Sequence, residues 1–480
     1  MKGNYHYIEG KTKEYIYLTN IKSLLDWDTS VNLPKDSFSS RAQQLNLLDS
    51  LISRITRDSK LLELVNTVNN SDLNAWQKRN LELMKNMLNE HMLYDDKLIK
   101  SISQASLKCE MKWRVAKAEG NFNLVKSEFQ ALISLIKEKA QIRAEWKNTS
   151  IYDALIDIYS PEVKCSEVNS ILSQIGSYIP TVIAKIRSEH NKDYNITSSQ
   201  VQFERISNHI VHGLGFNMNQ GRIDSSAHPF CGGHSEDVRI SYGNTTAKLL
   251  SKVLAVIHEC GHGLYLQGLP NEWTSTLAGQ FAGYAAHEAS ALLYEFFISK
   301  SDFYIQYLQS LFTKQGINIS CDLSKALRKV EWNNPIRIDA DPVTYPLHII
   351  LRTEIEKQLF EDKLQIADMP EYWRHLHKKL FGYEITSDTD GCLQDIHWYI
   401  GYFGYFPSYA IGVVCAAQLY FKLGLDKIAI IGKLCEAKDA LTKNFYQHGS
   451  LYKFSDLVKK ATGESLNPQH YFDFINTVYV

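Results

Sequence analysis

The chain has 480 residues, and its 52 lysine and arginine residues against 53 aspartate and glutamate residues give a formal net charge of −1. This balance excludes a strongly basic nucleic-acid-binding surface as the dominant feature. Hydrophobic residues make up 44% of the chain and aromatic residues 11%. That composition excludes an acidic disordered protein and predicts a large hydrophobic core.

Three features of the sequence favour a cytoplasmic protein without a membrane anchor. The most apolar run, residues 409–421, is 13 residues long and contains Gln418, whereas a bilayer-spanning helix needs roughly 18 to 20 residues. No apolar segment follows Lys2, so a secretory signal is not expected. The 8 cysteines show no C-x-x-C spacing, so we expect free thiols, mostly in the core, rather than a cysteine zinc site.

The first 190 residues show the periodicity of amphipathic helices. Between 125 and 140, apolar residues recur on one helical face, and the lysines and glutamates lie off that face. The same pattern predicts further helices over residues 40–57, 73–94, 98–118 and 166–190. Turn signals such as Gly120-Asn121 separate these segments.

The middle of the chain, residues 196–245, is richer in glycine, asparagine, serine and histidine. Short segments near 217–223 and 237–242 are candidates for extended structure, so a small β-sheet is expected near 215–245. Helical patterns resume after residue 247 and continue nearly to the C-terminus. The pattern as a whole predicts a mainly α-helical protein with one small sheet.

The most informative motif is H-E-x-x-H, which reads HECGH at residues 258–262. His258 and His262 are spaced one helical turn apart on the same face, so both imidazoles can reach one metal ion. Glu259 is rotated by about 100° from His258 and can hold a water molecule on that metal. The apolar segment 249–257 before the motif is compatible with a helix. The motif therefore predicts a catalytic metal centre rather than two histidines with ordinary hydrogen bonds.

A catalytic zinc site needs a third protein ligand and one open coordination position. The long form H-E-x-x-H-x-x-G-x-x-H is excluded, because Tyr265 and Gly268 stand where that form has glycine and histidine. The later block AHEAS offers His287 and Glu288, and spacing alone cannot choose between them. Weaker options for the third ligand are Glu272 and Glu295.

Several further blocks lie in order along nearly the whole chain: SLLDWD (23–28), RAQQL (41–45), YDALID (152–157), HPF (228–230), DVRIS (237–241), GLY and QGLP (263–265 and 267–270), IR and AD (336–337 and 340–341), VTYPLH (343–348), GYFPSY (404–409), and ATGE with NP (461–464 and 467–468). Together with HECGH and the HE pair at 287–288, these blocks resemble the carboxypeptidase Taq family of zinc metallocarboxypeptidases. A single block would be weak, but so many in the family's order are specific.

The resemblance implies that Glu288, 26 residues after His262, is the third metal ligand. The sequence departs from the family pattern at three places. Ser241 replaces the usual threonine and retains the hydroxyl, and residues 289–291 read ASA instead of the usual Ser-Gln-Ser, which alters a contact next to the metal ligand. Cys260 replaces a common alanine, and we expect it to pack away from the metal.

The reaction we infer is metal-assisted hydrolysis of a peptide bond. Zinc held by the two histidines and Glu288 would polarise the scissile carbonyl, while Glu259 takes a proton from water and passes it to the leaving amine. In related helical zinc peptidases a tyrosine stabilises the oxyanion. The GYFPSY block looks like the counterpart, so Tyr405 is expected in this role and Tyr409 is the second choice.

An enzyme that acts at the C-terminus of a peptide must bind a free carboxylate, and the planar guanidinium of arginine suits this task. The resemblance implies that Arg337, in the IR block at 336–337, serves this purpose. Arg239 and Arg352 are fallback candidates for which structural roles are favoured. His228 could either contact the substrate or brace the pocket.

The resemblance also implies an architecture, partners and a specificity. We expect one catalytic domain over residues 1–480, with a helical N-terminal part over about 1–195 and a metal-binding core over about 196–480, and two lobes that flank a deep groove. A homodimer is implied, as is release of single C-terminal residues from peptides, with broad specificity and proline disfavoured. Two histidines and one glutamate suit Zn²⁺, although Co²⁺ or another divalent ion could bind the same ligands.

Two other functions stay open. An oligopeptidase with the same metal centre would cut peptides internally and would need an open-ended groove rather than a clamp for a carboxylate. A non-catalytic helical binding protein with a vestigial metal site is disfavoured by the intact residues 258–262 and Glu288.

Overall fold

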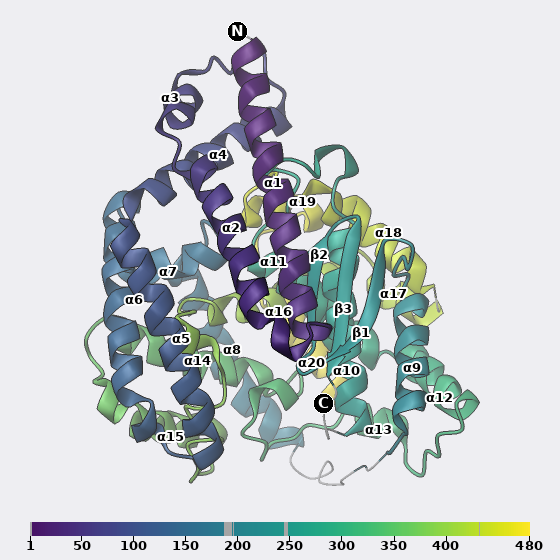
Figure 1. Ribbon diagram of the computed structural model, residues 1–480. Helices are drawn as coiled ribbons and strands as arrows, with labels where there is room; N and C mark the ends of the chain where they lie inside the picture. Colours follow the sequence, from purple (N-terminus) through teal and green to yellow (C-terminus); the bar gives the residue numbers. More distant parts are fainter. Residues whose placement is uncertain (1, 187–193, 195, 244–247, 432) are drawn as a thin grey trace. The chain divides into compact units, whose positions relative to one another are not determined.

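The computed structural model describes residues 2–186, 194, 196–243, 248–431 and 433–480. Most of these residues are helical, and one small sheet is the only β-structure among them (Figure 1). The predicted class, mainly α with a sheet near 215–245, is confirmed, although residues 244 and 245 lie outside the described part. In the described ranges, no helix combines the length and the apolar character that crossing a membrane requires.

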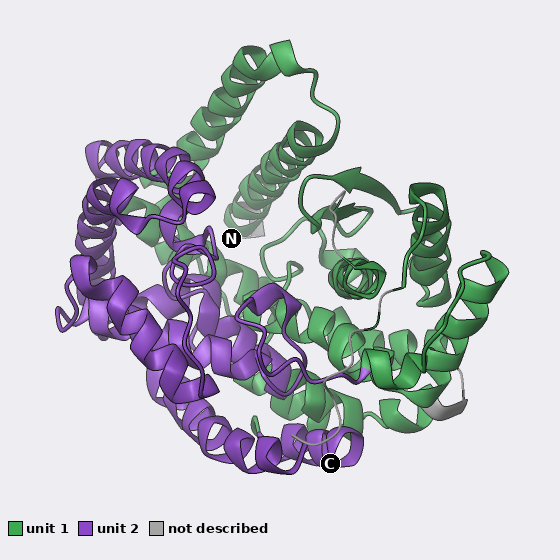
Figure 2. Cartoon of the chain, turned by 90° about the horizontal axis from the view of Figure 1, so that it is seen from below, with its two compact units in different colours: residues 1–92, 193–327, 415–467 green, residues 93–192, 328–414, 468–480 purple. Residues whose placement is uncertain are grey.

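The chain divides into two compact units, each built from three separate segments (Figure 2). The first unit contains residues 1–92, 193–327 and 415–467. The second unit contains residues 93–192, 328–414 and 468–480. Because each unit is assembled from distant segments, its core depends on contacts that no single stretch of sequence contains.

In the first unit, four N-terminal helices form a sub-assembly with its own hydrophobic core. They are α1 (Lys2–Val31), α2 (Phe38–Thr56), α3 (Ser59–Thr67) and α4 (Ala75–Leu93). Tyr5 and Ile8 of α1 are buried in a cluster with Ile55, Val65 and Met84. The α3 helix begins sharply because the Asp58 side chain accepts hydrogen bonds from the main-chain N–H groups of residues 60 and 61.

The sheet of the first unit has three strands: β1 (Gly221–Ser226), β2 (Phe230–His234) and β3 (Asp237–Gly243). Strand β3 is central and pairs with β1 in parallel and with β2 in antiparallel orientation. The sequence reading misses β2, because FCGGH contains two glycines and lacks an alternating pattern. Gly233 has φ +90°, and a Cβ there would lie 2.0 Å from the Asp237 carbonyl oxygen, so the β2–β3 turn requires glycine.

The end of α1 is anchored against this sheet. Trp27 is 1% exposed, and the guanidinium groups of Arg222 and Arg239 lie 5.2 and 4.7 Å from its ring centroid. The Ser23 hydroxyl also accepts a hydrogen bond from the Gly233 N–H at 3.1 Å. These contacts give a physical reason for the Trp-Asp block and place Arg239 in a structural role, as favoured from the sequence.

Behind the sheet, α10 (Leu249–Gln267) packs against β2, β3 and α11 (Tyr284–Leu292). The other α-helices lying wholly in the first unit are α9 (Gln200–Gly213), α12 (Asp302–Lys314), α13 (Leu323–Leu327), α17 (Leu425–Ile431), α18 (Leu434–Asn444) and α19 (Phe454–Thr462). Strand β3 and helices α10 and α11 are therefore successive layers, and the middle layer carries the H-E-x-x-H motif.

Among its described residues, the second unit contains helices and connecting segments but no strand. Its helices are α5 (Asp96–Glu119), α6 (Lys126–Lys147), α7 (Ile151–Tyr159), α8 (Cys165–Ile186), α14 (Tyr345–Phe360), α15 (Met369–Phe381) and α20 (Gln469–Tyr479), and α16 (Phe406–Lys422) contains residues of both units. The α14 helix packs against α7, α8 and α15 and so forms the centre of this unit.

The helices predicted from periodicity are confirmed with small errors at their ends. Those expected over 40–57, 73–94 and 98–118 are α2, α4 and α5, and the one expected over 166–190 is α8, although residues 187–190 lie outside the described part. The α6 helix continues beyond residue 140 to Lys147. The apolar pattern is weaker there because one of the two buried residues, Ala144, is small and the other, Arg143, is charged and donates to Asp157 at 2.7 Å.

Candidate metal centre

A buried cluster in the first unit brings together the three residues expected to bind a metal. His258 and His262 lie on α10 with ring centroids 4.8 Å apart. Glu288 on α11 places its Oε2 atom 3.8 Å from Nε2 of each histidine. Within the described part of the chain, this is the only group of three or more His, Cys, Asp or Glu side chains whose ligand atoms could share a metal ion, and these atoms lie within 4.8 Å of one another.

Two glycines on α10 allow this close packing. A Cβ on Gly261 would lie 2.7 Å from the Ala291 Cα atom, so α10 and α11 could not approach as closely with any larger residue. A Cβ on Gly263 would lie 2.8 Å from the Phe216 ring and 3.0 Å from the Ile240 side chain, on the side of the sheet. Gly261 therefore allows the close approach of α10 and α11, which carries Glu288, and Gly263 allows the close approach of α10 and the sheet.

Each histidine is oriented by a hydrogen bond from its Nδ1 atom. His258 Nδ1 lies 2.7 Å from Glu295 Oε2, and His262 Nδ1 donates to the His287 carbonyl oxygen at 3.0 Å. When both imidazoles are neutral, with Nδ1 as the donor in each ring, Nε2 carries the lone pair. Both Nε2 atoms lie toward the Glu288 carboxylate, which is the arrangement that a shared metal ion requires.

Glu295 is the contact that the sequence reading misses in this role, since it offers Glu295 only as a weak alternative ligand. The residue lies in a π-helical turn, Leu293–Phe297, that follows α11. Such turns arise where one residue is added to an α-helix, and they occur often at functional sites. Helical periodicity assumes a constant 3.6 residues per turn, so it gives no signal for the side chain that this turn directs toward His258.

The site combines buried histidines with three nearby carboxylates. Burial alone would lower the pKa of His258, but the hydrogen bond and charge of Glu295 raise it to about 9. Burial, with the neighbouring His287 and His258, holds the pKa of His262 well below its ordinary value. Burial raises the pKa of Glu259 to about 7. The cluster therefore favours a positive charge near Glu288 and Glu295, which a divalent cation would supply.

The donor set fits such a cation. Two imidazole nitrogens and one carboxylate are the protein ligands of many hydrolytic zinc sites. His262 and Glu288 are 7% and 3% exposed, whereas the His258 side chain is 20% exposed, so an ion would be held by two buried ligands and one that is partly exposed. Glu259 is also buried, and its Oε2 atom makes no hydrogen bond to any described residue. An orphaned carboxylate oxygen beside two metal-ligand candidates indicates that a polar group belongs there.

His228 lies in the loop between β1 and β2 and is exposed. Its main chain is held in place, because the Ser226 hydroxyl donates to the His228 carbonyl oxygen at 2.5 Å. The Ser241 hydroxyl lies 2.8 Å from the Ser226 hydroxyl and accepts the Phe230 N–H at 3.0 Å. Serine at position 241 thus retains the hydroxyl contacts that fix this loop.

Arg337, Tyr405 and Tyr409 belong to the second unit, where the fold brings them together from distant positions. The Arg337 guanidinium lies 5.1 Å from the centroid of the Tyr409 ring, and the rings of Tyr405 and Tyr409 are 5.3 Å apart. Tyr405 directly precedes α16, and Tyr409 lies in its first turn. The His397 ring also lies 5.3 Å from that of Tyr405.

Arg337 is paired with a residue that the sequence reading does not identify. Its Nε and Nη2 atoms donate to Asp395 Oδ1 at 3.0 and 2.8 Å, and no described residue accepts a hydrogen bond from its Nη1 atom. Burial alone would raise the pKa of Asp395, but the charges of Arg337 and Arg352 hold it far below its usual range. The ion pair therefore persists at any ordinary pH.

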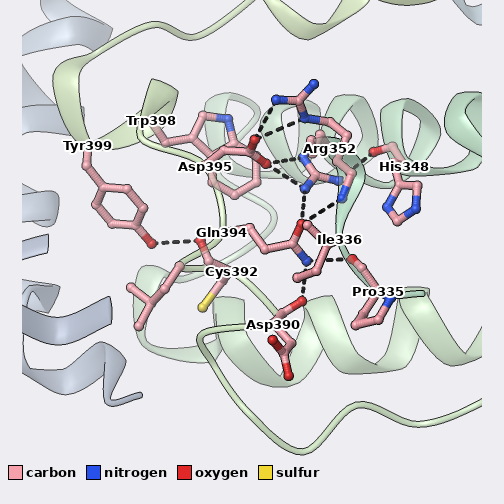
Figure 3. A network of polar contacts seen from close by, with 12 residues as sticks. Pro335, Ile336, His348, Arg352, Asp390, Cys392, Gln394, Asp395, Trp398 and Tyr399 are labelled. Atoms are coloured by element: carbon pink, nitrogen blue, oxygen red, sulfur yellow. Dashed lines mark hydrogen bonds and ion pairs between the residues drawn. The ribbon is translucent and has the colours of Figure 1, made fainter. Parts of the chain in front are cut away.

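Arg352 binds the other side of the same carboxylate (Figure 3). Its Nε atom donates to Asp395 Oδ2 at 2.7 Å, and its Nη2 atom donates to Gln394 Oε1 at 3.0 Å. Gln394 also accepts the main-chain N–H of Arg337 at 3.2 Å and donates to the Pro335 carbonyl oxygen at 2.7 Å. The sequence signal for this network is the run QDIHW at 394–398, which concentrates polar and aromatic residues outside any helical pattern.

Comparison with known proteins agrees with the fold and with the family resemblance seen in the sequence. The family described as "Carboxypeptidase Taq (M32) metallopeptidase" matches residues 7–479. Carboxypeptidase 1 of Bacillus subtilis (strain 168) is 29% identical over 485 residues, which cover 97% of this chain and 96% of that protein. Thermostable carboxypeptidase 1 of Thermus thermophilus is 27% identical over 494 residues, which cover 97% and 96%.

A solved structure leads to the same assignment. Metallocarboxypeptidase 1 of Trypanosoma cruzi is 28% identical and superposes with a TM-score of 0.94, covering 100% of both chains. The predicted resemblance is thereby confirmed. The family match spans nearly the whole chain, so this protein belongs to the carboxypeptidase Taq (M32) metallopeptidase family, and its enzyme class is that of a metallocarboxypeptidase, which hydrolyses peptides.

Proposed function

We propose that this enzyme uses Zn²⁺, held by His258 Nε2, His262 Nε2 and Glu288, to hydrolyse the last peptide bond of a peptide and release single C-terminal residues. The observation that carries the proposal is the orientation of the two Nε2 atoms toward Glu288, with both Nδ1 atoms engaged elsewhere. This ligand set suits zinc, and Co²⁺ or another divalent ion is the alternative.

In the proposed mechanism, the protein supplies a base, a hydroxyl donor and a means of positioning the substrate. Zinc in this site would polarise the scissile carbonyl and acidify the attacking water. Glu259 accepts the proton of that water and passes it to the leaving amine, and a pKa raised to about 7 by burial suits both steps. The Tyr405 hydroxyl stabilises the negative charge that develops on the carbonyl oxygen, with Tyr409 as the second candidate.

We propose that Arg337 recognises the C-terminal carboxylate of the substrate. Asp395 shares its single charge between Arg337 and Arg352 and holds the Arg337 fork rigid. The Nη1 atom of Arg337 remains for an incoming carboxylate. His228, exposed in a braced loop, is proposed to contact the peptide.

The family resemblance supports further proposals about specificity and assembly. We propose broad specificity at the released residue, with proline disfavoured, and a homodimer that acts in the cytoplasm. The substrates would be peptides with a free C-terminus. We also keep the proposal of one catalytic domain over 1–480, with a groove that limits access to flexible peptides.

The test is mass spectrometry of an unlabelled peptide incubated with zinc-loaded protein beside a Glu259→Gln variant. Stepwise loss of single C-terminal residues, absent in the variant and blocked by amidation of the peptide, is the expected result. Internal fragments that survive amidation would instead identify an oligopeptidase. Stoichiometric zinc without any cleavage would favour a binding protein.

A further inference from the structure

Glu356 is a fully buried carboxylate near the middle of the second unit. It lies on α14, and its exposed fraction is 0%. Three groups hydrogen-bond to it: the Trp398 indole N–H to Oε1 at 2.7 Å, the Tyr152 hydroxyl to Oε2 at 2.7 Å, and the Gly404 main-chain N–H to Oε2 at 3.0 Å. Burying a carboxylate is costly, and these three hydrogen bonds offset the cost and fix the position of the group.

The chemistry of the three donors requires two acceptor oxygens at this position. An indole N–H and a main-chain N–H can only donate, and here they point at different oxygens of Glu356. A hydroxyl such as that of Tyr152 can donate or accept. A glutamine in place of Glu356 has only one carbonyl oxygen, so it would leave the N–H of either Trp398 or Gly404 facing an amide NH₂ group.

These two N–H groups lie at the ends of the segment that leads to Tyr405. Gly404 has φ +83°, and a Cβ there would lie 2.5 Å from the main chain of Leu155, so the backbone before Tyr405 is tightly confined. One turn earlier on α14, Arg352 binds Gln394 and Asp395 (Figure 3). Two residues on successive turns of α14 therefore hold the segment from Gln394 to Gly404 along its length.

We propose that Glu356 is a positioning residue that fixes the backbone at Gly404 and thereby the place of the Tyr405 hydroxyl in the reaction. This inference rests on the proposed role of Tyr405. Tyr405 follows Gly404 directly, and its ring also contacts those of Tyr159 and His397 at 5.1 and 5.3 Å. The ring contacts limit where the side chain lies, while the Gly404 hydrogen bond fixes where the side chain begins.

The first test compares Glu356→Gln with Tyr152→Phe as a matched control. Tyr152→Phe removes one donor and leaves both acceptor oxygens for Trp398 and Gly404. We expect Glu356→Gln to lower kcat by about tenfold with KM within about twofold, and Tyr152→Phe to keep kcat close to that of the parent enzyme. Melting temperature is measured for both. Equal kcat in the two variants, with only the melting temperature changed, would overturn the proposal.

A rescue experiment separates positioning from loss of folding. In a Trp398→Phe background the amide of Glu356→Gln can turn its single oxygen toward Gly404, because no indole N–H competes. We expect Trp398→Phe/Glu356→Gln to match Trp398→Phe alone in kcat. Trp398→Phe/Glu356→Leu, which offers Gly404 no acceptor, should lose about tenfold. Equal kcat for the glutamine and leucine double variants would contradict the proposal, even if Glu356→Gln alone does not fold.

A double-mutant cycle with Tyr405→Phe tests the route of the effect. If Glu356 acts through the Tyr405 hydroxyl, Glu356→Gln should cause no further loss of kcat in the Tyr405→Phe background. If kcat of the double variant instead falls by the product of the two single-variant factors, the effects are independent and the proposal is contradicted. If Tyr405→Phe alone leaves kcat unchanged, both the role of Tyr405 and the positioning role of Glu356 fall, while C-terminal release by the parent enzyme would still support the proposed carboxypeptidase.

Discussion

Buried carboxylates are paired differently in the two units. The comparison is between the candidate metal centre of the first unit and the arginine network of the second. At the candidate metal centre, Glu259 has a buried oxygen without a described partner, and the Glu288 carboxylate faces Nε2 of both histidines. In the second unit, Asp395 is bound on both oxygens by Arg337 and Arg352. An added cation would complete the first arrangement as proposed, whereas the carboxylate of the second is paired within the protein and serves as a rigid frame. If the contrast holds, removing the cation should have the largest effect on activity, and changes to single side chains should have smaller effects.

Metal removal should abolish activity. Without the cation, nothing polarises the substrate carbonyl, and the buried carboxylates near His258 lose their counter-charge. Dialysis against a chelator is expected to bring hydrolysis below detection and to lower the melting temperature, and Zn²⁺ should restore both. Full activity in protein shown by elemental analysis to be metal-free would contradict the proposed centre.

Substitution of the base should cost nearly as much. Glu259→Gln keeps the size of the side chain and removes its ability to take a proton, so kcat should fall by roughly 10²- to 10⁴-fold. Metal content, measured by mass spectrometry, should stay at one ion per chain, because Glu259 is not a proposed ligand. A variant that loses its metal instead would place Glu259 in the ligand set.

Arg337→Ala tests whether the satisfied network also serves the substrate. We expect kcat/KM for a peptide with a free C-terminus to fall by roughly 10- to 100-fold, mainly through KM, because charged hydrogen bonds to the carboxylate are lost. Arg337→Lys keeps the charge but not the planar fork, so its kcat/KM should lie between those of the parent enzyme and Arg337→Ala. Unchanged kinetics would mean that the arginine only holds Asp395, and would favour an oligopeptidase.

Glu295→Gln probes the orientation of a single ligand. The amide cannot accept the His258 Nδ1–H as strongly as a carboxylate, so zinc affinity should fall by about 10- to 100-fold. Competition with a chromophoric chelator measures this directly. Glu272→Gln, in a short turn outside the cluster, is the matched control and should leave affinity unchanged.

The smallest effect concerns the pH dependence of the metal-free protein. The pKa of His258 is raised from an ordinary 6.5 to about 9, so the protonated ring stabilises the fold fully below pH 6.5, and that contribution is lost as pH rises through about 9. The melting temperature of metal-stripped protein should therefore decline by roughly 2 °C across this range. In Glu295→Gln the decline should be shallower, and an equal decline in both proteins would assign it to other groups.

The sequence predicted those parts of the molecule whose signals are local. His258, Glu259 and His262 could be found because one turn of one helix sets their relation, and periodicity found α2, α4 and α5 because polar and apolar faces alternate cleanly. Strand β2 carries no alternation, since its two glycines serve a tight turn. The proposed third ligand could be chosen only through the family resemblance, because Glu288 lies on a different helix.

Contacts assembled from distant segments left no comparable signal. Asp395 joins Arg337 and Arg352, which come from a loop and a helix that meet only in the folded unit. Glu356 looks like an ordinary polar residue on α14, and nothing in its spacing reveals that Trp398 and Gly404 both point at it. Such residues become visible only when the partners of each buried polar group are traced one by one.

The π-helical turn Leu293–Phe297 makes the metal site sensitive to the length of the chain. Deleting one residue in this turn, before Glu295, would restore α-helical spacing and change the direction in which the Glu295 side chain points relative to Glu288. His258 would then lose its hydrogen-bond partner although no ligand had been replaced. A single-residue deletion there would leave every proposed ligand in place and would still weaken metal binding, as a change of side chain would.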